Sequence, residues 1–441
     1  MNQNSGFRTF LIIWAGQFVS MLGTGMTRFA LLIWAYQQTG SATTLALLGF
    51  FAWLPFIIVS PIAGVWVDRL DRRRVMIWAD VGSALLSVFV LTMLLTGHLA
   101  IWQIYLLEGM SSLFDAFQLP AYMASVSTLL DKKDYARANG LRSLAFDGTQ
   151  IVAPILAGLL LPWIGIGGVM TIDLSTFVVA MITLLIVAIP LIPKSNTGGE
   201  ESFWHEVRFG SRFIFARPGL LGLMLIFAGI EFFATLTYFA VLPTLILKRT
   251  GGDEGALGLV QATLGAAGVV GGILVSTFGL PKRKIHAVLA GCGLSFLFGD
   301  FLFAIGRSLS WWMVAAAVAA VFIPFIVSAD RTIWQNKVPP SMQGRVFSTS
   351  NAVRWGTKPI AFLIAGPIAD RLLEPAMQAG GALAPIFGWL VGTGAGAGIA
   401  LMFVGTSIFG SLISFGGYLV PALRNVETAL PDHDETHSQD V

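Results

Sequence analysis

The sequence predicts an all-α membrane protein with twelve transmembrane helices, arranged as two six-helix bundles related by a pseudo-two-fold axis along the membrane normal. Of its 441 residues, 55% are hydrophobic and only 12% are charged, against roughly 25% charged in an ordinary soluble domain. The apolar residues come in continuous blocks of about 20 or more, long enough for a helix to cross a ~30 Å hydrocarbon core. Blocks without alternation favour helices over a closed barrel, the other fold that satisfies its backbone hydrogen bonds in lipid.

Polar breaks between the apolar blocks set the predicted ends of the twelve spans. The spans are 9–36, 43–67, 75–96, 100–128, 138–162, 168–190, 219–247, 256–279, 285–306, 311–336, 346–370 and 390–421. The stretch 382–423 is apolar, rich in glycine and longer than one crossing needs. We therefore expect the first part of the twelfth span to lie outside the membrane or at its surface.

The two halves of the chain resemble each other at a fixed offset of 208 residues. The matching pairs are Gly64 with Gly272, Arg137 with Arg345, Ala157 with Ala365 and Gly158 with Gly366. Small residues often match by chance, but the same offset also superposes the span boundaries. It predicts two repeats related by an axis along the membrane normal, with a central cleft between them.

Lys and Arg are distributed unevenly between the two sides of the predicted membrane. With the N-terminus inside, twenty of them fall in the inside segments and four in the outside segments. The four are Lys248, Arg249, Arg307 and Arg371. Under the positive-inside rule this bias predicts a multi-pass protein of the cell (inner) membrane with both termini cytoplasmic. No cleavage site follows the first apolar block, so we expect it to be retained as a helix.

Four segments make up the predicted domain organisation. Residues 1–190 form the first six-helix bundle and residues 219–423 form the second. Residues 191–218 form a cytoplasmic linker, whose amphipathic stretch places Ile214 opposite Arg208 and Arg212 and predicts a helix on the inner membrane surface. Residues 424–441 form a cytoplasmic tail that is acidic towards its end and is expected to be disordered.

The loop between spans two and three carries the most specific motif. Residues 64–74 read Gly-Val-Trp-Val-Asp-Arg-Leu-Asp-Arg-Arg-Arg. This segment resembles the Gly-x-x-x-Asp-Arg-x-Gly-Arg-Arg signature of the major facilitator superfamily. The resemblance implies a latch between the halves in the outward-open state, formed by Gly64, Asp68, Arg69, Arg72 and Arg73. From the residues alone, Gly64 permits a close helix approach, and Asp68 can pair with Arg72 or Arg73 or face a helix N-terminus. The alternative is that the arginines only fix topology.

Three further segments strengthen the resemblance. They are Ile-Trp-Ala-Gly-Gln at 13–17, Phe-Gln-Leu-Pro-Ala at 117–121 and Gln-Gly-Arg-Val-Phe-Ser at 343–348. They are similar to the macrolide-efflux-like branch of the superfamily, which includes relatives of the enterobactin exporter. This implies an efflux antiporter of the multidrug kind, exporting a drug, macrolide or siderophore-type compound. Two departures concern coupling: Asp71 replaces the usual glycine of the loop motif, and span four lacks the arginine of many proton antiporters.

Polar side chains form a stripe on each of five otherwise apolar spans. The stripes are Gln17, Ser20, Thr24, Thr27 and Arg28 on span one; Glu108, Ser111, Asp115, Gln118 and Tyr122 on span four; Asp147 and Gln150 on span five; Glu231, Thr235 and Tyr238 on span seven; and Asn351, Arg354 and Lys358 on span eleven. A charge at bilayer depth costs at least ~2.5–3.5 kcal/mol on insertion scales, so it should face a cavity or a partner. Five stripes predict one shared, hydrated cavity.

Four carboxylates are candidates for proton coupling: Asp115, Asp147, Glu231 and Glu108. Burial disfavours a charged carboxylate, so such a group can take up a proton on one side and release it on the other. The candidates for lining the cavity or contacting substrate are Gln17, Thr24, Arg28, Gln118, Tyr122, Tyr238, Arg354 and Lys358. The three cations either hold the acids charged in one state or contact an acidic group of the substrate. The alternative is that some of these groups are static pairs that brace the bundle.

Three other embedded acids are assigned structural roles. Asp173 and Asp300 lie on spans that should be peripheral, towards the outer face. Asp80 lies near the inner start of span three, where a carboxylate can cap the helix.

The leading hypothesis is a secondary active transporter that exports a small hydrophobic or amphiphilic compound with proton coupling. Import of a small solute and a non-transporting membrane sensor are the alternatives. The five histidines lie in loops, near span ends or in the tail, and no metal-ligand spacing or Gly-x-x-x-x-Gly-Lys-Ser/Thr loop appears, which argues against an enzyme and an ATP-driven pump. We expect a monomer whose partners are substrate, protons and the lipid bilayer, without nucleic acid, cofactor or metal.

Overall fold

The structure, a computed structural model, is helical throughout the part of the chain that it describes. It describes residues 3–130, 134–187, 203–340 and 342–432, without the side chains of 3–5, 65, 68, 69, 127, 136 and 203–207. The chain divides into two compact units, Met1–Asn196 with Gly252–Ala262, and Thr197–Gly251 with Thr263–Val441. The predicted all-α fold is confirmed.

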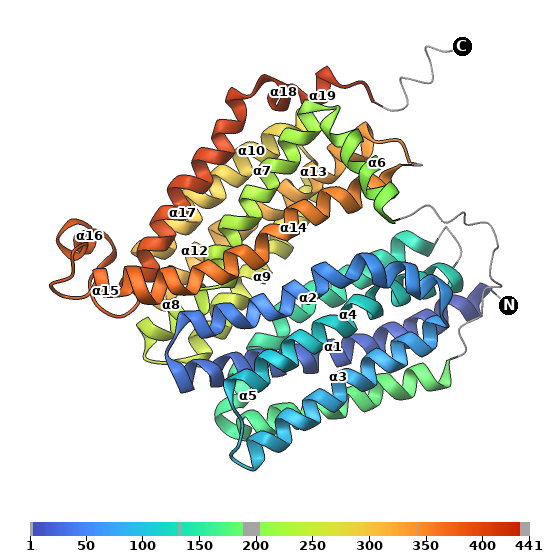
Figure 1. Cartoon of the computed structure of the whole chain (residues 1–441), viewed down its shortest axis with the longest axis horizontal. Coiled ribbons are helices and arrows are strands. Elements are labelled where there is room, and N and C mark those ends of the chain that lie inside the picture. Colours follow the sequence, from blue (N-terminus) through green and yellow to red (C-terminus); the bar gives the residue numbers. More distant parts are fainter. Residues whose placement is uncertain (1–2, 131–133, 188–202, 341, 433–441) are drawn as a thin grey trace. The chain divides into compact units, whose positions relative to one another are not determined.

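The helices of the first unit run alongside one another (Figure 1). They are α1 (Gln3–Thr39), α2 (Ala42–Arg69), α3 (Arg72–Leu95), α4 (Ile101–Leu129) and α5 (Tyr135–Ile186). The long helix α5 contains two spans, because Gly165 within it has φ 63°, a conformation that glycine adopts without steric cost. The chain reverses there: Trp14 Nε1 donates to Leu141 O at 2.8 Å, while Gly16, two residues further along α1, packs against Thr183.

The spans of the second unit are assembled from shorter pieces. The helices from 203 onwards are α6 (Phe203–Phe215), α7 (Pro218–Ala234), the π-helix η2 (Thr235–Phe239), α8 (Leu242–Thr250), α9 (Glu254–Phe278), α10 (Lys284–Leu294), the π-helix η3 (Ser295–Asp300), α11 (Phe301–Ile305), α12 (Leu309–Val321), α13 (Ile323–Lys337), α14 (Gln343–Pro367), the π-helix η4 (Ile368–Leu373), α15 (Glu374–Ala376), α16 (Ala384–Val391), α17 (Ala397–Gly416), the 3₁₀ turn η5 (Gly417–Leu419), α18 (Pro421–Arg424) and α19 (Val426–Ala429). The first part of α9, as far as Ala262, is grouped with the first unit.

Twelve spans follow from the helices of the described residues. Nine helical stretches are long and apolar enough to cross a membrane, and one of them, Arg137–Ile186, counts twice because it reverses at Gly165. The other two spans are α4 and α14, whose polar stripes lower their hydropathy. The predicted repeat is visible in these elements: α4 covers Ile101–Leu129 and span ten covers Leu309–Lys337, each end 208 residues further on.

The region before the last span is a separate short helix, α16, followed by a glycine-rich turn. Gly392, Gly394 and Gly396 all have positive φ, which glycine alone tolerates cheaply, and α17 begins directly afterwards. The twelfth span is therefore shorter than the apolar stretch of the sequence. The placement of α16 outside the membrane stays a prediction.

The loop between α2 and α3 differs in two ways from the sequence interpretation. Asp71 caps α3 by accepting hydrogen bonds from the backbone N–H groups of Arg73 and Arg74 at 3.0 and 3.4 Å, so the prediction that Asp80 caps this helix is wrong. Asp80 lies more than two turns inside it. The predicted close helix approach at Gly64 is not seen among the described residues, where a Cβ at this position would meet no atom within 4 Å.

Arg72 and Arg73 of the predicted latch bind helix ends within the first unit. Arg72 Nη1 donates to Ala124 O at 2.8 Å and to Thr128 Oγ1 at 2.6 Å. Arg73 donates to the carbonyl oxygens of Leu184 and of the next residue, at 2.9 and 2.7 Å. Lys and Arg donors near a helix C-terminus satisfy carbonyls that lack an intrahelical partner. The side chains of the other two charged latch residues, 68 and 69, lie outside the described part.

The segment after α17 is ordered as far as residue 432, so the predicted disorder is wrong for 424–432. Val426 of α19 is fully buried. The Nζ of Lys337, at the end of α13, donates to Glu427 O at 2.6 Å and to Leu430 O, and lies 2.7 Å from Asp432 Oδ1. A buried ammonium needs such partners, and these tie the segment down. The rest of the predicted tail, 433–441, lies outside the described residues.

Helix α6 lies in the predicted linker and packs on α14. Ile214 is buried, while Arg208 and Arg212 are exposed. Gly210 permits the contact, since a Cβ there would collide with Thr349 and Arg345 O. Its location on the membrane surface stays a prediction.

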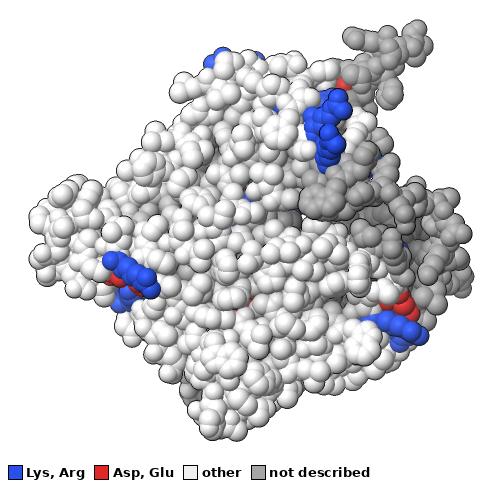
Figure 2. Space-filling view, viewed as in Figure 1, with Lys and Arg blue, Asp and Glu red and all other residues white. Residues whose placement is uncertain are grey.

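Two apolar clusters close the ends of the first unit and leave a polar zone between them. One contains Phe10 and Ile13, and the other contains Leu31 and Ala35. On α1 the polar stripe occupies the turns between these pairs. The face seen in Figure 2 is largely uncharged, with Lys and Arg gathered in a few places, as expected of helices that face lipid.

Labelling of introduced cysteines tests the predicted orientation, because the native cysteine is buried. Cys292 is 2% exposed, so the wild-type protein should not react with a membrane-impermeant maleimide. His98→Cys should be labelled in intact cells and Lys282→Cys only after permeabilisation, because the predicted topology puts these exposed positions on opposite sides. Labelling of Lys282→Cys in intact cells would contradict cytoplasmic termini.

Candidate functional site

Arg28 is the centre of a charged cluster in the first unit. Its Nη2 lies 3.1 Å from Asp115 Oδ2 and its Nε lies 3.7 Å from Glu108 Oε2. The two acids are two turns apart on α4 and therefore share a face. The Glu108 side chain is only 9% exposed, whereas those of Arg28 and Asp115 are 45% and 46% exposed. One cation thus bridges a buried and an accessible carboxylate.

Asp173, in the second half of α5, adds a third carboxylate to this cluster. Its Oδ1 accepts a hydrogen bond from Thr24 at 3.1 Å, and it interacts electrostatically with Arg28. The helices come this close because of Gly23, where a Cβ would collide with Thr176 and Asp173. Asp173 was expected to be peripheral and structural; it lies beside two predicted site residues.

A second polar network joins α1, α3 and α4. Asp80, 9% exposed, accepts hydrogen bonds from Gln17 Nε2 at 3.2 Å and from Gln118 Nε2 at 2.5 Å. Gln118 Nε2 also lies 3.3 Å from Gln17 Oε1. Two predicted cavity residues thus bind a buried carboxylate through neutral amides.

The second unit contains a two-point ion pair between α14 and α13. Arg354 Nη1 and Nη2 donate to Asp330 Oδ2 and Oδ1 at 2.7 and 3.0 Å, and Trp334 Nε1 donates to Oδ1 at 3.0 Å. The guanidinium lies over the Phe227 ring, 4.3 Å from its centroid. Both charged residues are buried. Parallel N–H···O bonds of this kind are strong and fix geometry, so the pair holds the two helices together.

Lys358 and Glu231 form another pair in the same unit. The Nζ–Oε2 distance is 3.1 Å, and the side chains are 10% and 29% exposed. Lys358 Nζ also lies 5.4 Å from the centroid of Phe239. Of the three embedded cations, Arg28 and Lys358 contact candidate acids, whereas Arg354 contacts Asp330, which was not a candidate.

Tyr238 lies in a polar group between η2, η3 and α17. Its hydroxyl donates to Asp300 Oδ1, and Thr406 Oγ1 donates to Asp300 Oδ2. Asp300 is fully buried, and the rings of Phe303 and Phe403 pack edge-on against Tyr238 at 5.7 and 5.8 Å. Both π-helices place a residue in this group, and such irregular turns recur at functional sites.

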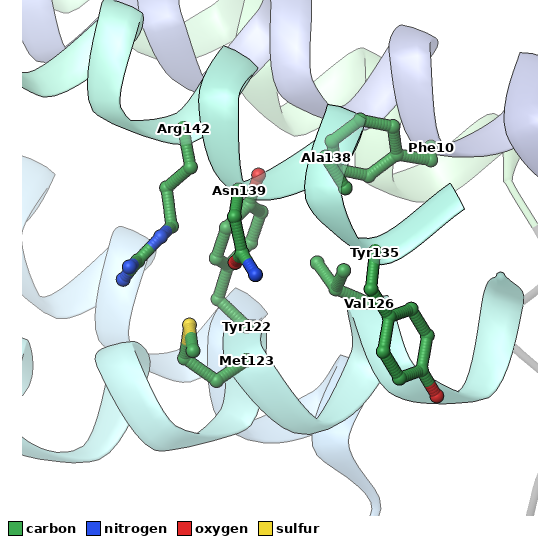
Figure 3. A pocket seen from close by; sticks show the side chains of 8 residues that line it. All are labelled: Phe10, Tyr122, Met123, Val126, Tyr135, Ala138, Asn139 and Arg142. Carbon is green, nitrogen blue, oxygen red and sulfur yellow. The ribbon is translucent and has the colours of Figure 1, made fainter. Parts of the chain in front are cut away.

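Two predicted site residues lie at the first part of α5: Asp147 belongs to this helix, and Tyr122 faces it from α4. Asp147 is exposed on α5. Tyr122, on α4, lines a cavity together with Asn139 and Arg142 of α5 (Figure 3).

The two units differ in charge balance. In the first, Arg28 lies within ion-pair distance of Glu108 and Asp115 and interacts electrostatically with Asp173; in the second, Arg354 pairs with Asp330 and Lys358 with Glu231. Surplus negative charge in an apolar bundle is costly unless it binds protons or a cation. Among the described residues no three His, Cys, Asp or Glu side chains are arranged to hold a metal ion.

Twelve spans, an internal repeat and buried charge clusters in both units define a polytopic membrane transporter. Residues 13–358 match the sequence profile of the Major Facilitator Superfamily. The chain belongs to that family, and it is a transporter, not an enzyme.

Relatives with named functions are efflux proteins. Macrolide efflux protein A of Streptococcus pyogenes is 26% identical over 366 residues, which cover 82% of this chain and 90% of the relative. The multidrug efflux pump Tap of Mycolicibacterium fortuitum is 24% identical over 368 residues, covering 79% and 86%. The resemblance to an efflux-type branch is therefore confirmed.

Solved transporters share the fold. A bacterial homolog of the human lysosomal transporter Spinster aligns with a TM-score of 0.67 at 16% identity, covering 98% of this chain and 99% of that one. The nucleoside transporter NupG aligns with a TM-score of 0.62 at 12% identity, covering 94% and 99%.

The Arg354–Asp330 pair should contribute strongly to stability. Asp330→Asn or Arg354→Gln leaves one buried charge without its partner, which should lower the free energy of unfolding by about 3–5 kcal/mol. Denaturant unfolding in detergent measures this. The double variant should be less destabilised than the sum of the single variants, and Lys282→Gln, at an exposed position, should stay within about 0.5 kcal/mol of wild type. Single variants as stable as wild type would contradict the assignment.

Proposed function

We propose that this chain is a proton-coupled exporter of small hydrophobic or amphiphilic organic compounds that works by alternating access. The Arg28 cluster carries the proposal, because it gathers three carboxylates around one cation inside an apolar bundle. The names of two relatives, a macrolide efflux protein and a multidrug efflux pump, support export and the substrate class. The protein acts as a monomer with both termini in the cytoplasm.

Asp115 is the proposed proton carrier of the cluster. It is the accessible acid, whereas Glu108 is almost completely buried. Arg28 offsets one of the three negative charges and leaves a surplus of two, which a proton on Asp115 reduces to one. Protonation weakens the Arg28–Asp115 pair and frees Arg28 to hold Glu108, so a single proton shifts the ion pair by two turns along one face of α4.

Substrate competes with the proton at this cluster. A compound with an amine or another hydrogen-bond donor can take the place of the proton beside Asp115, because either one neutralises or satisfies the same carboxylate. Binding from the cytoplasm then releases a proton, and uptake of a proton from outside expels the compound. For an uncharged compound, one proton moving through ~100 mV supplies about 2.3 kcal/mol, enough for about a 50-fold concentration ratio.

Glu231 and Lys358 are the proposed counterpart in the second unit. Glu231 is 29% exposed and lies 3.1 Å from Lys358, and it contributes polar contacts to the substrate. Asp147, exposed on α5, has the same proposed role. Gln17, Gln118 and the Asp80 that they bind form a polar wall.

The substitution Asp115→Asn tests the coupling role. The amide keeps the shape and one acceptor but takes no proton, so uphill export should fall from about a 50-fold ratio to equilibration. Downhill exchange should continue. A cell-based efflux screen across diverse amphiphiles, starting with macrolides and repeated with a protonophore, supplies the substrate, and proteoliposomes with an imposed proton gradient give the ratio.

A matched control is Asp253→Asn, which changes an exposed carboxylate that caps α9 through Ala256 N. This variant should pump like wild type. Uphill transport by Asp115→Asn at the wild-type ratio would remove Asp115 from the mechanism. Wild-type export that survives the protonophore would remove proton coupling, and gradient-driven accumulation inside cells would indicate an importer.

A further inference from the structure

A cavity of about 190 Å³ lies between α1, α4 and the start of α5 in the first unit. Phe10, Tyr122 and Tyr135 supply aromatic walls, and Asn139 and Arg142 supply the polar groups. Figure 3 shows Asn139 and Arg142 projecting from α5 on the side of Tyr122. Tyr122 is the last member of the polar stripe of α4, so the cavity continues the face that carries the Arg28 cluster.

Arg142 brings a positive charge to this cavity. Among the described residues, no carboxylate forms an ion pair with it. Its side chain is half-buried, and its Nε is buried without a hydrogen-bond partner. It interacts electrostatically with Tyr122. Arg28 and Arg354, the other arginines of the embedded clusters, both lie within ion-pair distance of acids. A buried donor of this kind favours an anion or another acceptor beside it.

The internal repeat shows which residues of the second half correspond to the lining of this cavity. Positions 122, 126 and 139 correspond, at the offset of 208, to Asp330, Trp334 and Phe347. In the second unit Trp334 packs edge-on against Phe347 with centroids 6.1 Å apart and donates to Asp330. Trp334 is 4% exposed. In the first half the positions of Trp334 and Phe347 are taken by the smaller residues Val126 and Asn139. The volume that the two aromatic rings fill in the second unit is therefore part of the cavity in the first unit.

We propose that this cavity is a binding site for the anionic end of an amphiphile. The ligand is a carboxylate or phosphate joined to an aromatic or acyl group, with the anion at Arg142 and Asn139 and the apolar part against Phe10 and Tyr122. The guanidinium fork matches either anion with two hydrogen bonds. Pockets for whole drug-sized ligands measure roughly 300–1,000 Å³, so this smaller cavity takes one end of the molecule.

Two sources supply this chemistry: a soluble aromatic acid, or an anionic phospholipid, since basic pockets between transmembrane helices bind such headgroups. The site does not depend on the direction of transport or on proton coupling. Its failure and the failure of the proposed function are therefore distinguishable.

Purified full-length protein in a neutral detergent tests the site with two matched probe pairs. The first pair is 1-naphthylacetate and the uncharged 1-naphthylacetamide; the second is phosphatidylglycerol and phosphatidylcholine. The shift in melting temperature with probe concentration gives each Kd. At least one anionic probe should bind wild-type protein about tenfold more tightly than its uncharged or zwitterionic counterpart.

Three substitutions assign the binding to the cavity. Arg142→Gln should remove the preference for the anion. Val126→Trp, or Asn139→Phe if the first variant folds poorly, should block binding by introducing the side chain found in the second half. Arg137→Gln is the matched control, because Arg137 is exposed and lies over the Phe7 ring, 4.6 Å from its centroid; it should bind like wild type.

The outcomes separate cleanly. Binding of the naphthyl acid alone identifies a soluble ligand, and binding of phosphatidylglycerol alone identifies a lipid; either supports the site if it needs Arg142. Anionic and neutral probes that bind equally, or anion binding that survives both Arg142→Gln and the filled cavity, would overturn the proposal.

Discussion

A charge placed inside an apolar helix bundle must be paired or neutralised, and this constraint organises both halves of the molecule. Moving an ion out of water costs several kcal/mol even after the protein relaxes. Each embedded cation of the three clusters accordingly has a carboxylate within 3.1 Å. Glycines at the helix contacts, such as Gly23, allow the approach that these short distances require.

The two halves meet this constraint differently, although they share one repeat. In the second unit Arg354 pairs with Asp330 and Lys358 with Glu231, and Trp334 and Phe347 pack beside the first of these pairs. The first unit surrounds Arg28 with three acids and leaves an open cavity beside Arg142. The ion pairs and packing of the second unit suit a rigid support. Under the proposed function, the excess carboxylates around Arg28 exchange the coupled proton.

Sequence reasoning predicted the spans and most of the site because hydropathy and helical spacing are local properties. Arg28 with Glu108 and Asp115, and Lys358 with Glu231, were all on predicted stripes. The partners Asp80, Asp173 and Asp330 were missed because they lie on other spans, and contacts between helices depend on packing that spacing does not encode. The internal repeat could have indicated Asp330, because this residue lies 208 residues after Tyr122 and so corresponds to a member of the polar stripe on span four. Asp71 was seen as a departure from a motif, but its role as a cap depends on the turn geometry.

The central claim is that the surplus carboxylates around Arg28 exchange a proton with water. Infrared difference spectroscopy of the purified protein in lipid, recorded across a pH titration, observes the C=O stretch of protonated carboxylic acids directly. The account predicts a band in wild-type protein that grows as pH falls and loses one component in Asp115→Asn, a component that Asp253→Asn retains. An unchanged band in Asp115→Asn would contradict the account.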